Sequence, residues 1–146
     1  MIHKAPTQLI PELWPLIQEH AKAAMRWHPF MDEEDVLVQL LHGHGQLFVA
    51  TDAEGVLGFA VVEVICYPSR RVANVLAAGG RKGFLGTLVR DVYPLMEKWA
   101  IEQGADFFCV MGRPGWLKYA RQHEGVNSLQ ITVSQKRLGN VGWRNS

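Results

Sequence analysis

The stretch that most constrains the fold runs from Val72 to Gly104, because it predicts a strand, a glycine-rich turn and a long helix in succession. The apolar run Val72–Ala78 has the length of one buried strand and is too short for a helix. Residues 79–83 (GGRKG) supply a turn whose glycines tolerate positive φ angles. Apolar residues then recur at helical spacing, and Gly104 follows as a C-terminal cap. These apolar residues are Leu85, Leu88, Val89, Val92, Met96, Trp99 and Ala100.

The turn between this strand and this helix has the features of an anion-binding site. Backbone N–H groups at the start of a helix point over the turn, where the helix dipole adds partial positive charge. Arg81 and Lys82 would strengthen this attraction for a phosphate or pyrophosphate. The alternative is that the glycines only make a tight turn and that both cations are solvated. The motif by itself does not distinguish an anion-binding turn from a purely structural one.

Size and charge limit the protein to a few broad classes. A chain of 146 residues fits one domain with a substantial core. Its net charge of +1 gives no signature of nucleic-acid or membrane binding. The two cysteines, Cys66 and Cys109, both lie in apolar runs, which predicts reduced core residues and a cytoplasmic location. We expect no signal peptide and no membrane span, because no run has the required pattern or length.

The residues before the turn predict a short strand and two helices. Met1–Pro6 is expected to form the strand. A helical stripe of apolar residues follows, and we expect its regular part to start near Trp14, because two prolines lie upstream. Asp32 is predicted to be the N-cap of the second helix, and Asp35 lies three positions after it. Gly43 is predicted to end this helix.

Two strands are predicted between the second helix and the glycine turn. They span Gly45–Thr51 and Val56–Tyr67, and the residues between them form a hairpin turn. The second strand is almost continuously apolar, which is typical of a central strand covered on both faces. Glu63 interrupts it. A carboxylate at this position must face solvent, a cleft or a partner, because burial without a partner is costly.

The last part of the chain predicts one more buried strand, a short helix and one or two final strands. The strand covers Ala105–Met111, and GRPGW (112–116) then opens the helix. Final strands are expected within 128–138. The element order is therefore (β)ααβββαβαβ. This order predicts an α/β (α+β) protein with a mixed central sheet of about six or seven strands and helices on both faces.

This element order resembles the GNAT superfamily of acyl-CoA-dependent N-acetyltransferases over Ile2–Leu138, so residues 1–138 are expected to form one GNAT-like domain followed by a tail at 139–146. The pairing of LAAGGRKGFLGTL with the later GRPGW is similar, more narrowly, to GNAT-like proteins of tailed phages and prophages. Two positions depart from the wider family. Arg81, Gly83 and Gly86 give R-x-G-x-x-G with altered glycine spacing, and Arg121 stands where the family has a tyrosine, with Tyr119 nearby.

The resemblance implies acetyl-CoA as cofactor and a set of residues that would hold it. On this chain the strand donors would be Leu76, Ala77 and Ala78, and the pyrophosphate donors would be Arg81, Lys82, Gly83, Phe84, Leu85 and Gly86. Glu63 is the candidate catalytic base, because it is the carboxylate inside a central strand. Tyr119 is the candidate acid. The alternatives are that Glu63 simply points to solvent and that Tyr119 is a structural tyrosine.

Two functions fit these sequence features. The first is transfer of an acetyl group from acetyl-CoA to an amine of a protein or small molecule. The alternative is a catalytically inactive phage-derived protein, located in the host cytoplasm, that acts as a virion or morphogenesis component or binds a host protein. A homodimer is also compatible with the sequence, whereas nucleic acid and membrane are not expected partners. No metal is expected, since the pair His42 and His44 lacks a partnering carboxylate or cysteine motif.

Overall fold

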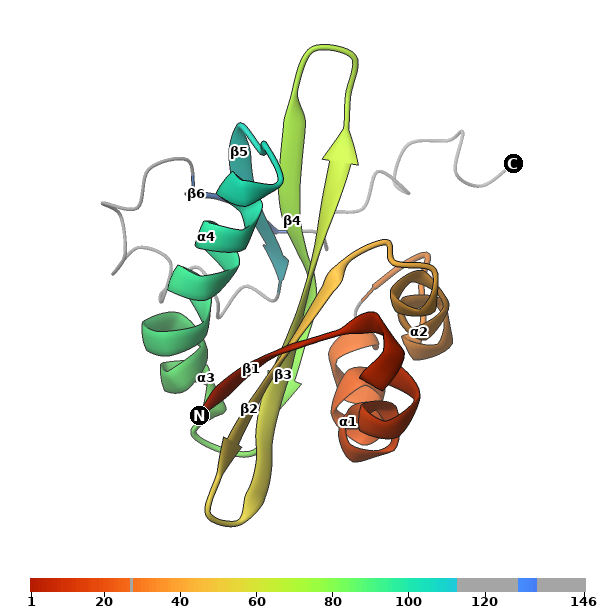
Figure 1. Cartoon of the computed structure of the whole chain (residues 1–146), viewed down its shortest axis with the longest axis vertical. Helices are drawn as coiled ribbons and strands as arrows, with labels where there is room; N and C mark the ends of the chain where they lie inside the picture. The colour runs from red at the N-terminus through yellow and green to blue at the C-terminus, as the bar shows by residue number, and fades with distance from the viewer. Residues whose placement is uncertain (27, 113–128, 134–146) are drawn as a thin grey trace.

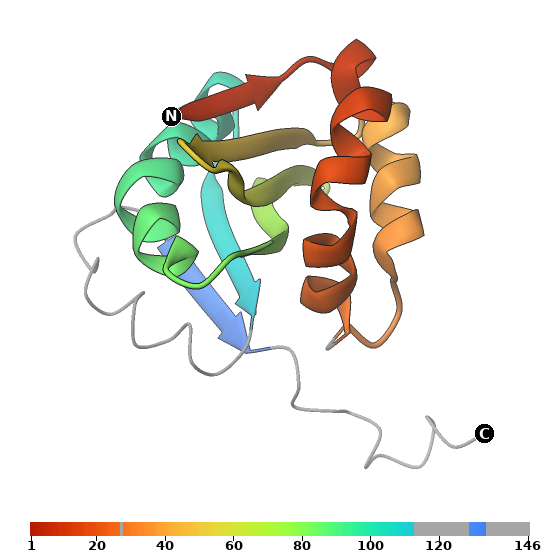
Figure 2. The same cartoon turned by 90° about the horizontal axis from the view of Figure 1, so that it is seen from below.

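The protein is described by a computed structural model that covers residues 1–26, 28–112 and 129–133. In this part of the chain, one mixed sheet of six strands lies between two layers of helices (Figures 1 and 2). The strands follow each other across the sheet in sequence order. They are β1 (Ile2–Ala5), β2 (Gln46–Asp52), β3 (Gly55–Cys66), β4 (Arg71–Gly80), β5 (Phe107–Gly112) and β6 (Leu129–Val133). Strands β1 to β4 pair antiparallel, and β4, β5 and β6 pair parallel. The predicted fold class is confirmed.

Each face of the sheet carries its own hydrophobic core. Helices α1 (Ile10–Met25) and α2 (Glu33–Leu41) cover one face, and α3 (Phe84–Thr87) with α4 (Tyr93–Glu102) covers the other (Figure 2). The side chains of β3 alternate between the two cores: Val61 is buried under α1 and α2, and its neighbour Val62 is buried on the opposite face. Two covered faces explain why β3 is almost continuously apolar.

Helix α1 begins at Ile10, so the predicted start near Trp14 is wrong. A short 3₁₀ turn (η1, Thr7–Leu9) leads into it. Pro11 lies in the first turn, where a backbone N–H would have no helical partner, and Pro15 removes only one hydrogen bond near the helix start. Burial of Ile10 and Trp14 against the sheet offsets that loss.

Helix α2 begins with the predicted cap. The carboxylate of Asp32 accepts a hydrogen bond from the backbone N–H of Asp35 at 3.0 Å, and the Asp35 carboxylate accepts one from the N–H of Asp32 at 2.9 Å. Two amides that the helix leaves unpaired are satisfied in this way. Gly43, with φ +74°, follows the helix as predicted.

Replacing Asp32 with alanine is expected to lower the free energy of unfolding by about 1 kcal/mol, because the first turn of α2 loses its side-chain acceptor. Asp32→Asn is the matched control, since asparagine also caps helices and should leave stability almost unchanged. Urea denaturation followed by circular dichroism measures both variants. Equal stability of the alanine and asparagine variants would contradict the role of this cap.

The helix predicted after the glycine turn contains a widened turn. A π-helical turn (η2, Leu88–Val92) lies between α3 and α4. Pro94 explains it: the residue has no N–H to donate to the carbonyl of Arg90, and its ring would clash with that carbonyl in a regular helix. Leu88 and Val92 remain buried through the π turn, so the apolar face of the helix stays on the sheet. No helix in the described part of the chain is long and apolar enough to cross a membrane.

Candidate functional site

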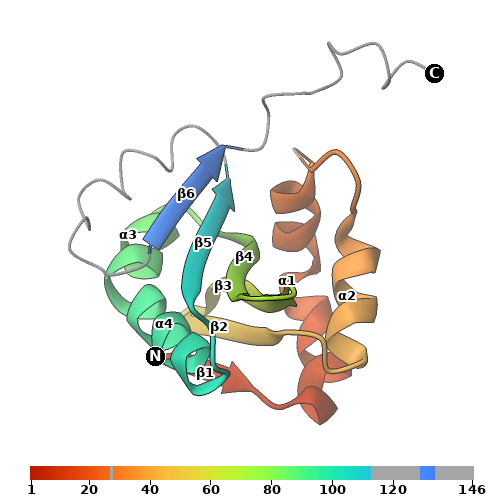
Figure 3. The ribbon, with the colours of Figure 1, turned by 90° about the horizontal axis from the view of Figure 1, so that it is seen from above.

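Strands β4 and β5 separate part-way along their length. Their parallel pairing runs from Val72, opposite Phe107, to Val75, opposite Val110. Strand β4 then continues to Gly80 without a paired strand on that side among the described residues. Figure 3 shows β5 running next to β4, with β6 beyond it. Among the described residues, the separation therefore leaves backbone hydrogen-bonding groups of β4 without a partner on its β5 side.

A β-bulge lies where the two strands separate. Val61 pairs with Ala77, but its neighbour Val62 pairs with Val75, so Leu76 is the extra residue on β4. As a result Leu76 and Ala77, although adjacent, both belong to the core under α1 and α2. A bulge bends its strand and increases the local twist. The three strand residues predicted to contact a cofactor, Leu76, Ala77 and Ala78, therefore lie at a bend in β4.

The glycine turn after β4 presents several unpaired backbone amides. Gly83 has φ +92°, a left-handed conformation that glycine adopts without steric cost. The N–H groups of Lys82, Gly83, Leu85 and Gly86 have no acceptor in the described part of the chain. The N–H groups of two predicted donors are already used: Arg81 donates to the carbonyl of Leu57 at 2.8 Å, and Phe84 donates to the carbonyl of Arg81 at 3.0 Å. The available set is therefore smaller than the predicted one.

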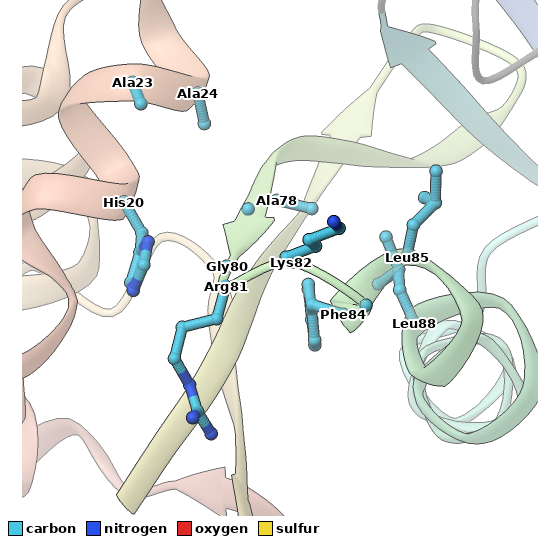
Figure 4. A pocket seen from close by; sticks show the side chains of 12 residues that line it. His20, Ala23, Ala24, Ala78, Gly80, Arg81, Lys82, Phe84, Leu85 and Leu88 are labelled. Carbon is cyan, nitrogen blue, oxygen red and sulfur yellow. The ribbon is translucent and has the colours of Figure 1, made fainter.

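A cavity of about 360 Å³ lies between this turn and helix α1. In Figure 4, His20, Ala23 and Ala24 of α1 line one side, and Leu85 and Leu88 line the other. The alanines leave space where larger side chains would fill the gap. The glycine turn is thus next to an open space, which a phosphate-bearing ligand could enter.

The side chain of Arg81 is directed away from Lys82 and binds the β2–β3 hairpin (Figure 4). Its guanidinium donates to the carboxylates of Asp52 and Glu54, each at 2.5 Å, and to the carbonyl of Val56 at 3.0 Å. The hydrogen bond from Arg81 lowers the pKa of Asp52, and the two carboxylates raise the pKa of Arg81. Within the described residues Lys82 makes no ion pair, so its cation is the one near the turn that remains available.

The ring of Phe84 packs on the sheet below the turn. The side chain is 3% exposed and lies against the backbone of Gly58 on β3 and of Gly80 on β4. A Cβ atom added to Gly80 would lie 2.8 Å from Cγ of Phe84. These glycines therefore let the ring approach the backbone, which fixes the start of α3 against the end of β4.

Glu63 lies at a second cavity, of about 390 Å³, rather than at the glycine turn. The residues that line this cavity with Glu63 are Gln39, His42, Gly43, His44, Gly45, Val64, Trp99 and Gln103. Burial raises the pKa of Glu63 above its ordinary value, and a hydrogen bond from Asn74 opposes that shift. Asn74 was missed by sequence reasoning. The sequence feature that pointed to it is that Asn74 is the one polar residue within the apolar run Val72–Ala78.

Other predicted features fall outside the part that the structure describes. Tyr119, the candidate acid, lies there, as do residues 113–116 of the GRPGW segment, the short helix predicted to follow them and the tail at 139–146. Among the described residues, no group of three or more histidine, cysteine or acidic side chains is placed to hold a metal ion.

The fold can be compared with solved structures. A predicted acetyltransferase from Clostridium acetobutylicum, determined with acetyl-CoA, is similar with a TM-score of 0.66 and 12% identity over 94% of each chain. The fold is GNAT-like. An aminoglycoside acetyltransferase from an uncultured soil metagenomic sample, in complex with sisomicin, has a TM-score of 0.63 and 16% identity over 94% of this chain and 95% of its own.

A ribosomal-protein-alanine N-acetyltransferase from Brucella melitensis has a TM-score of 0.58 and 14% identity over 86% of this chain and 90% of its own. At such low identity these likenesses show the GNAT-like fold alone. No family model matches the sequence, and no curated protein matches it. The comparisons give no link to phage proteins, so the narrower resemblance stays a prediction.

Proposed function

We propose that this protein is an N-acetyltransferase that transfers an acetyl group from acetyl-CoA to an amine. One observation supports this most directly: beyond Val75, β4 has no paired strand on its β5 side among the described residues, and it enters a turn whose unpaired amides border a cavity. Such amides bind phosphate groups well. The similarity of the fold to acetyltransferases is in keeping with this proposal.

The residues that would hold acetyl-CoA are divided between the strand and the turn. The amides of Lys82, Gly83, Leu85 and Gly86, with the Lys82 cation, fit a pyrophosphate. The β5-facing edge of Leu76–Ala78 fits the pantetheine and the thioester carbonyl, whose developing negative charge backbone N–H groups stabilise. Acetyl-CoA supplies the activated acyl group.

Glu63 is proposed as the base that removes a proton from the attacking amine. An alkylammonium ion has a pKa of about 10, so the amine must lose a proton before it attacks. Because Glu63 and the glycine turn line separate cavities, proton transfer through a water molecule is the route that fits this placement. Tyr119 stays a proposal for the acid that protonates the leaving thiolate.

Isothermal titration of the full chain with acetyl-CoA tests the proposal. We expect heat of binding and a rise in melting temperature, because a ligand that binds only the folded state stabilises it. Absence of both at millimolar acetyl-CoA would remove the enzyme proposal.

Filling the cavity beside the turn is expected to weaken acetyl-CoA binding. Ala23 is half-buried on α1 and lines the cavity, so the indole of Ala23→Trp would occupy the space between α1 and the turn. We expect a loss of affinity of about tenfold or more, equivalent to about 1.4 kcal/mol. Ala23→Ser is the control of similar size. If the tryptophan variant folds and binds acetyl-CoA as tightly as the serine variant, the cofactor does not use this cavity.

The alternative function is a protein that keeps the fold without catalysis and acts by binding a partner. The ion pairs of Arg81 with Asp52 and Glu54 favour this function, because they occupy the cation at the start of the glycine turn. A stoichiometric protein partner in a pull-down, together with no acetyl turnover on a panel of amines, would support this function.

A further inference from the structure

Arg81, at the start of the glycine turn, is held by the β2–β3 hairpin through both its backbone and its side chain. Its backbone N–H donates to the carbonyl of Leu57 at 2.8 Å, and its Nε donates to the carbonyl of Val56 at 3.0 Å. Its two terminal nitrogens donate to the carboxylates of Asp52 and Glu54. All four acceptors lie within residues 52–57, so one short segment fixes the start of the turn.

The hairpin orients one of these carboxylates by a separate contact. Asp52 pairs with Gly55 at the end of β2, and its Oδ1 accepts a hydrogen bond from the backbone N–H of Glu54 at 2.9 Å. A bond of this kind, from a backbone N–H two residues on, stabilises a tight turn. The other oxygen, Oδ2, accepts from Arg81. The hairpin therefore presents an oriented acceptor to the planar set of donors on the guanidinium.

Arg81 also fixes the backbone around amides that lack an acceptor. Its carbonyl accepts a hydrogen bond from the N–H of Phe84 at 3.0 Å, which closes the turn over Lys82 and Gly83. The N–H groups of these two residues have no acceptor in the described part of the chain. Glycine loses more backbone freedom on ordering than any other residue, so a loose turn would be costly for a ligand to order. A ligand that binds an already ordered turn avoids this cost.

Resting on the proposed function, we infer that Asp52 and Glu54 are positioning residues for the pyrophosphate of acetyl-CoA: through Arg81 they hold the turn amides in the arrangement that binds the anion. Direct electrostatics predicts the opposite sign. Two carboxylates beside the turn repel an anion, and their removal would also release the guanidinium of Arg81. Loss of both carboxylates should therefore weaken anion binding if they position the turn, and strengthen it if repulsion dominates. We expect binding to weaken.

The double variant Asp52→Asn/Glu54→Gln, which keeps the size of both side chains, tests this inference. Calorimetric titrations at one ionic strength would use acetyl-CoA and, separately, inorganic pyrophosphate. Both ligands should bind about fivefold more weakly than they bind the unaltered chain. Asp91→Asn/Glu102→Gln is the matched control, because it also removes two exposed carboxylates and one exposed ion pair, that of Arg90 with Asp91. The control should bind at least as tightly as the unaltered chain. Equal or tighter binding by Asp52→Asn/Glu54→Gln would overturn the inference.

The motion of the turn without ligand gives a second readout, which a change in overall stability would not move. Nitrogen-15 relaxation of the Lys82, Gly83 and Gly86 amides should give order parameters of about 0.85 in the unaltered chain and in the control, as in rigid backbone. In Asp52→Asn/Glu54→Gln they should fall toward the values of flexible segments, below about 0.6. A turn that stays equally rigid in this variant would contradict the positioning role.

Arg81→Lys separates the geometry of the side chain from its charge. Lysine keeps the positive charge but lacks the planar donors that reach both carboxylates and the carbonyl of Val56 together. It should weaken acetyl-CoA binding about as much as the loss of the two carboxylates does. Combining the three substitutions should add little, because they remove one shared set of contacts. Full affinity in Arg81→Lys would overturn the inference, and this variant decides if Asp52→Asn/Glu54→Gln does not fold.

Failure of this inference is distinguishable from failure of the proposed function. If the unaltered chain and Asp52→Asn/Glu54→Gln bind acetyl-CoA equally well, the acetyltransferase proposal stands and the positioning role falls. If the chain binds pyrophosphate but not acetyl-CoA, and the variant binds pyrophosphate more weakly, the positioning role stands and the acetyltransferase proposal falls. Binding of neither ligand by the unaltered chain would overturn both.

Discussion

Glu63→Gln is expected to lower kcat/KM for acetyl transfer by about 100-fold, because the amide that replaces the carboxylate cannot accept the proton of the amine. The change keeps the size of the side chain, and the glutamine oxygen can still accept the hydrogen bond from Asn74. Binding of acetyl-CoA should be unchanged, since Glu63 does not line the cavity at the glycine turn.

The pH dependence gives an independent check on the same residue. A base works only in its deprotonated form, so the rate falls as pH falls through the pKa of Glu63. Burial raises that pKa above the ordinary value of 4.5, so the acid limb of kcat/KM should lie above pH 4.5 and should disappear in Glu63→Gln. Glu102→Gln, which changes an exposed carboxylate on α4, is the matched control. It should keep both the value of kcat/KM and the acid limb of its pH profile. An unchanged pH profile in Glu63→Gln would show that another group is the base.

Gly80→Ala is expected to lower the free energy of unfolding by about 3 kcal/mol, because the end of β4 has no room for a methyl group. The added Cβ would clash with the carbonyl oxygen of Leu57 and would lie 2.7 Å from Cα of Gly58 and 2.8 Å from Cγ of Phe84. Two of these three atoms belong to the backbone of β3, which cannot move without breaking the pairing with β4. Relief by side-chain rotation alone is therefore excluded.

Gly86→Ala is the matched control for this substitution. A Cβ at position 86 would meet no heavy atom within 4 Å, and alanine favours helix by up to about 1 kcal/mol over glycine. Thermal or urea denaturation of the two variants should therefore show a large loss for Gly80→Ala and little change or a gain for Gly86→Ala. Similar losses in both would mean that close packing at Gly80 does not determine stability.

Local sequence signals predicted the elements of this fold. Asp32 followed by Asp35 marked the start of α2, the polar turn after β2 marked the hairpin, and two-sided burial was evident from the apolar run of β3. Such signals act through the backbone and through near neighbours, so they are present in the sequence itself. Local signals mispredicted the start of α1. The prolines indicated a start near Trp14, but packing of Ile10 and Trp14 on the sheet stabilised a helix that begins at Ile10.

Within the described residues, the sequence by itself determined the order of strands and helices and the glycine turn, because each depends on residues close together in the chain. It also singled out Glu63 as the candidate base, which stays a prediction. Only the tertiary structure decided which groups meet. It bound Arg81 to the β2–β3 hairpin, placed Asn74 beside Glu63, and put Glu63 at a different cavity from the turn. These contacts join residues that are 11 to 29 positions apart in the sequence. They depend on the register of the strands and on the bulge at Leu76. A shift of one residue in that register would turn the side chains of the shifted strand to the opposite face of the sheet.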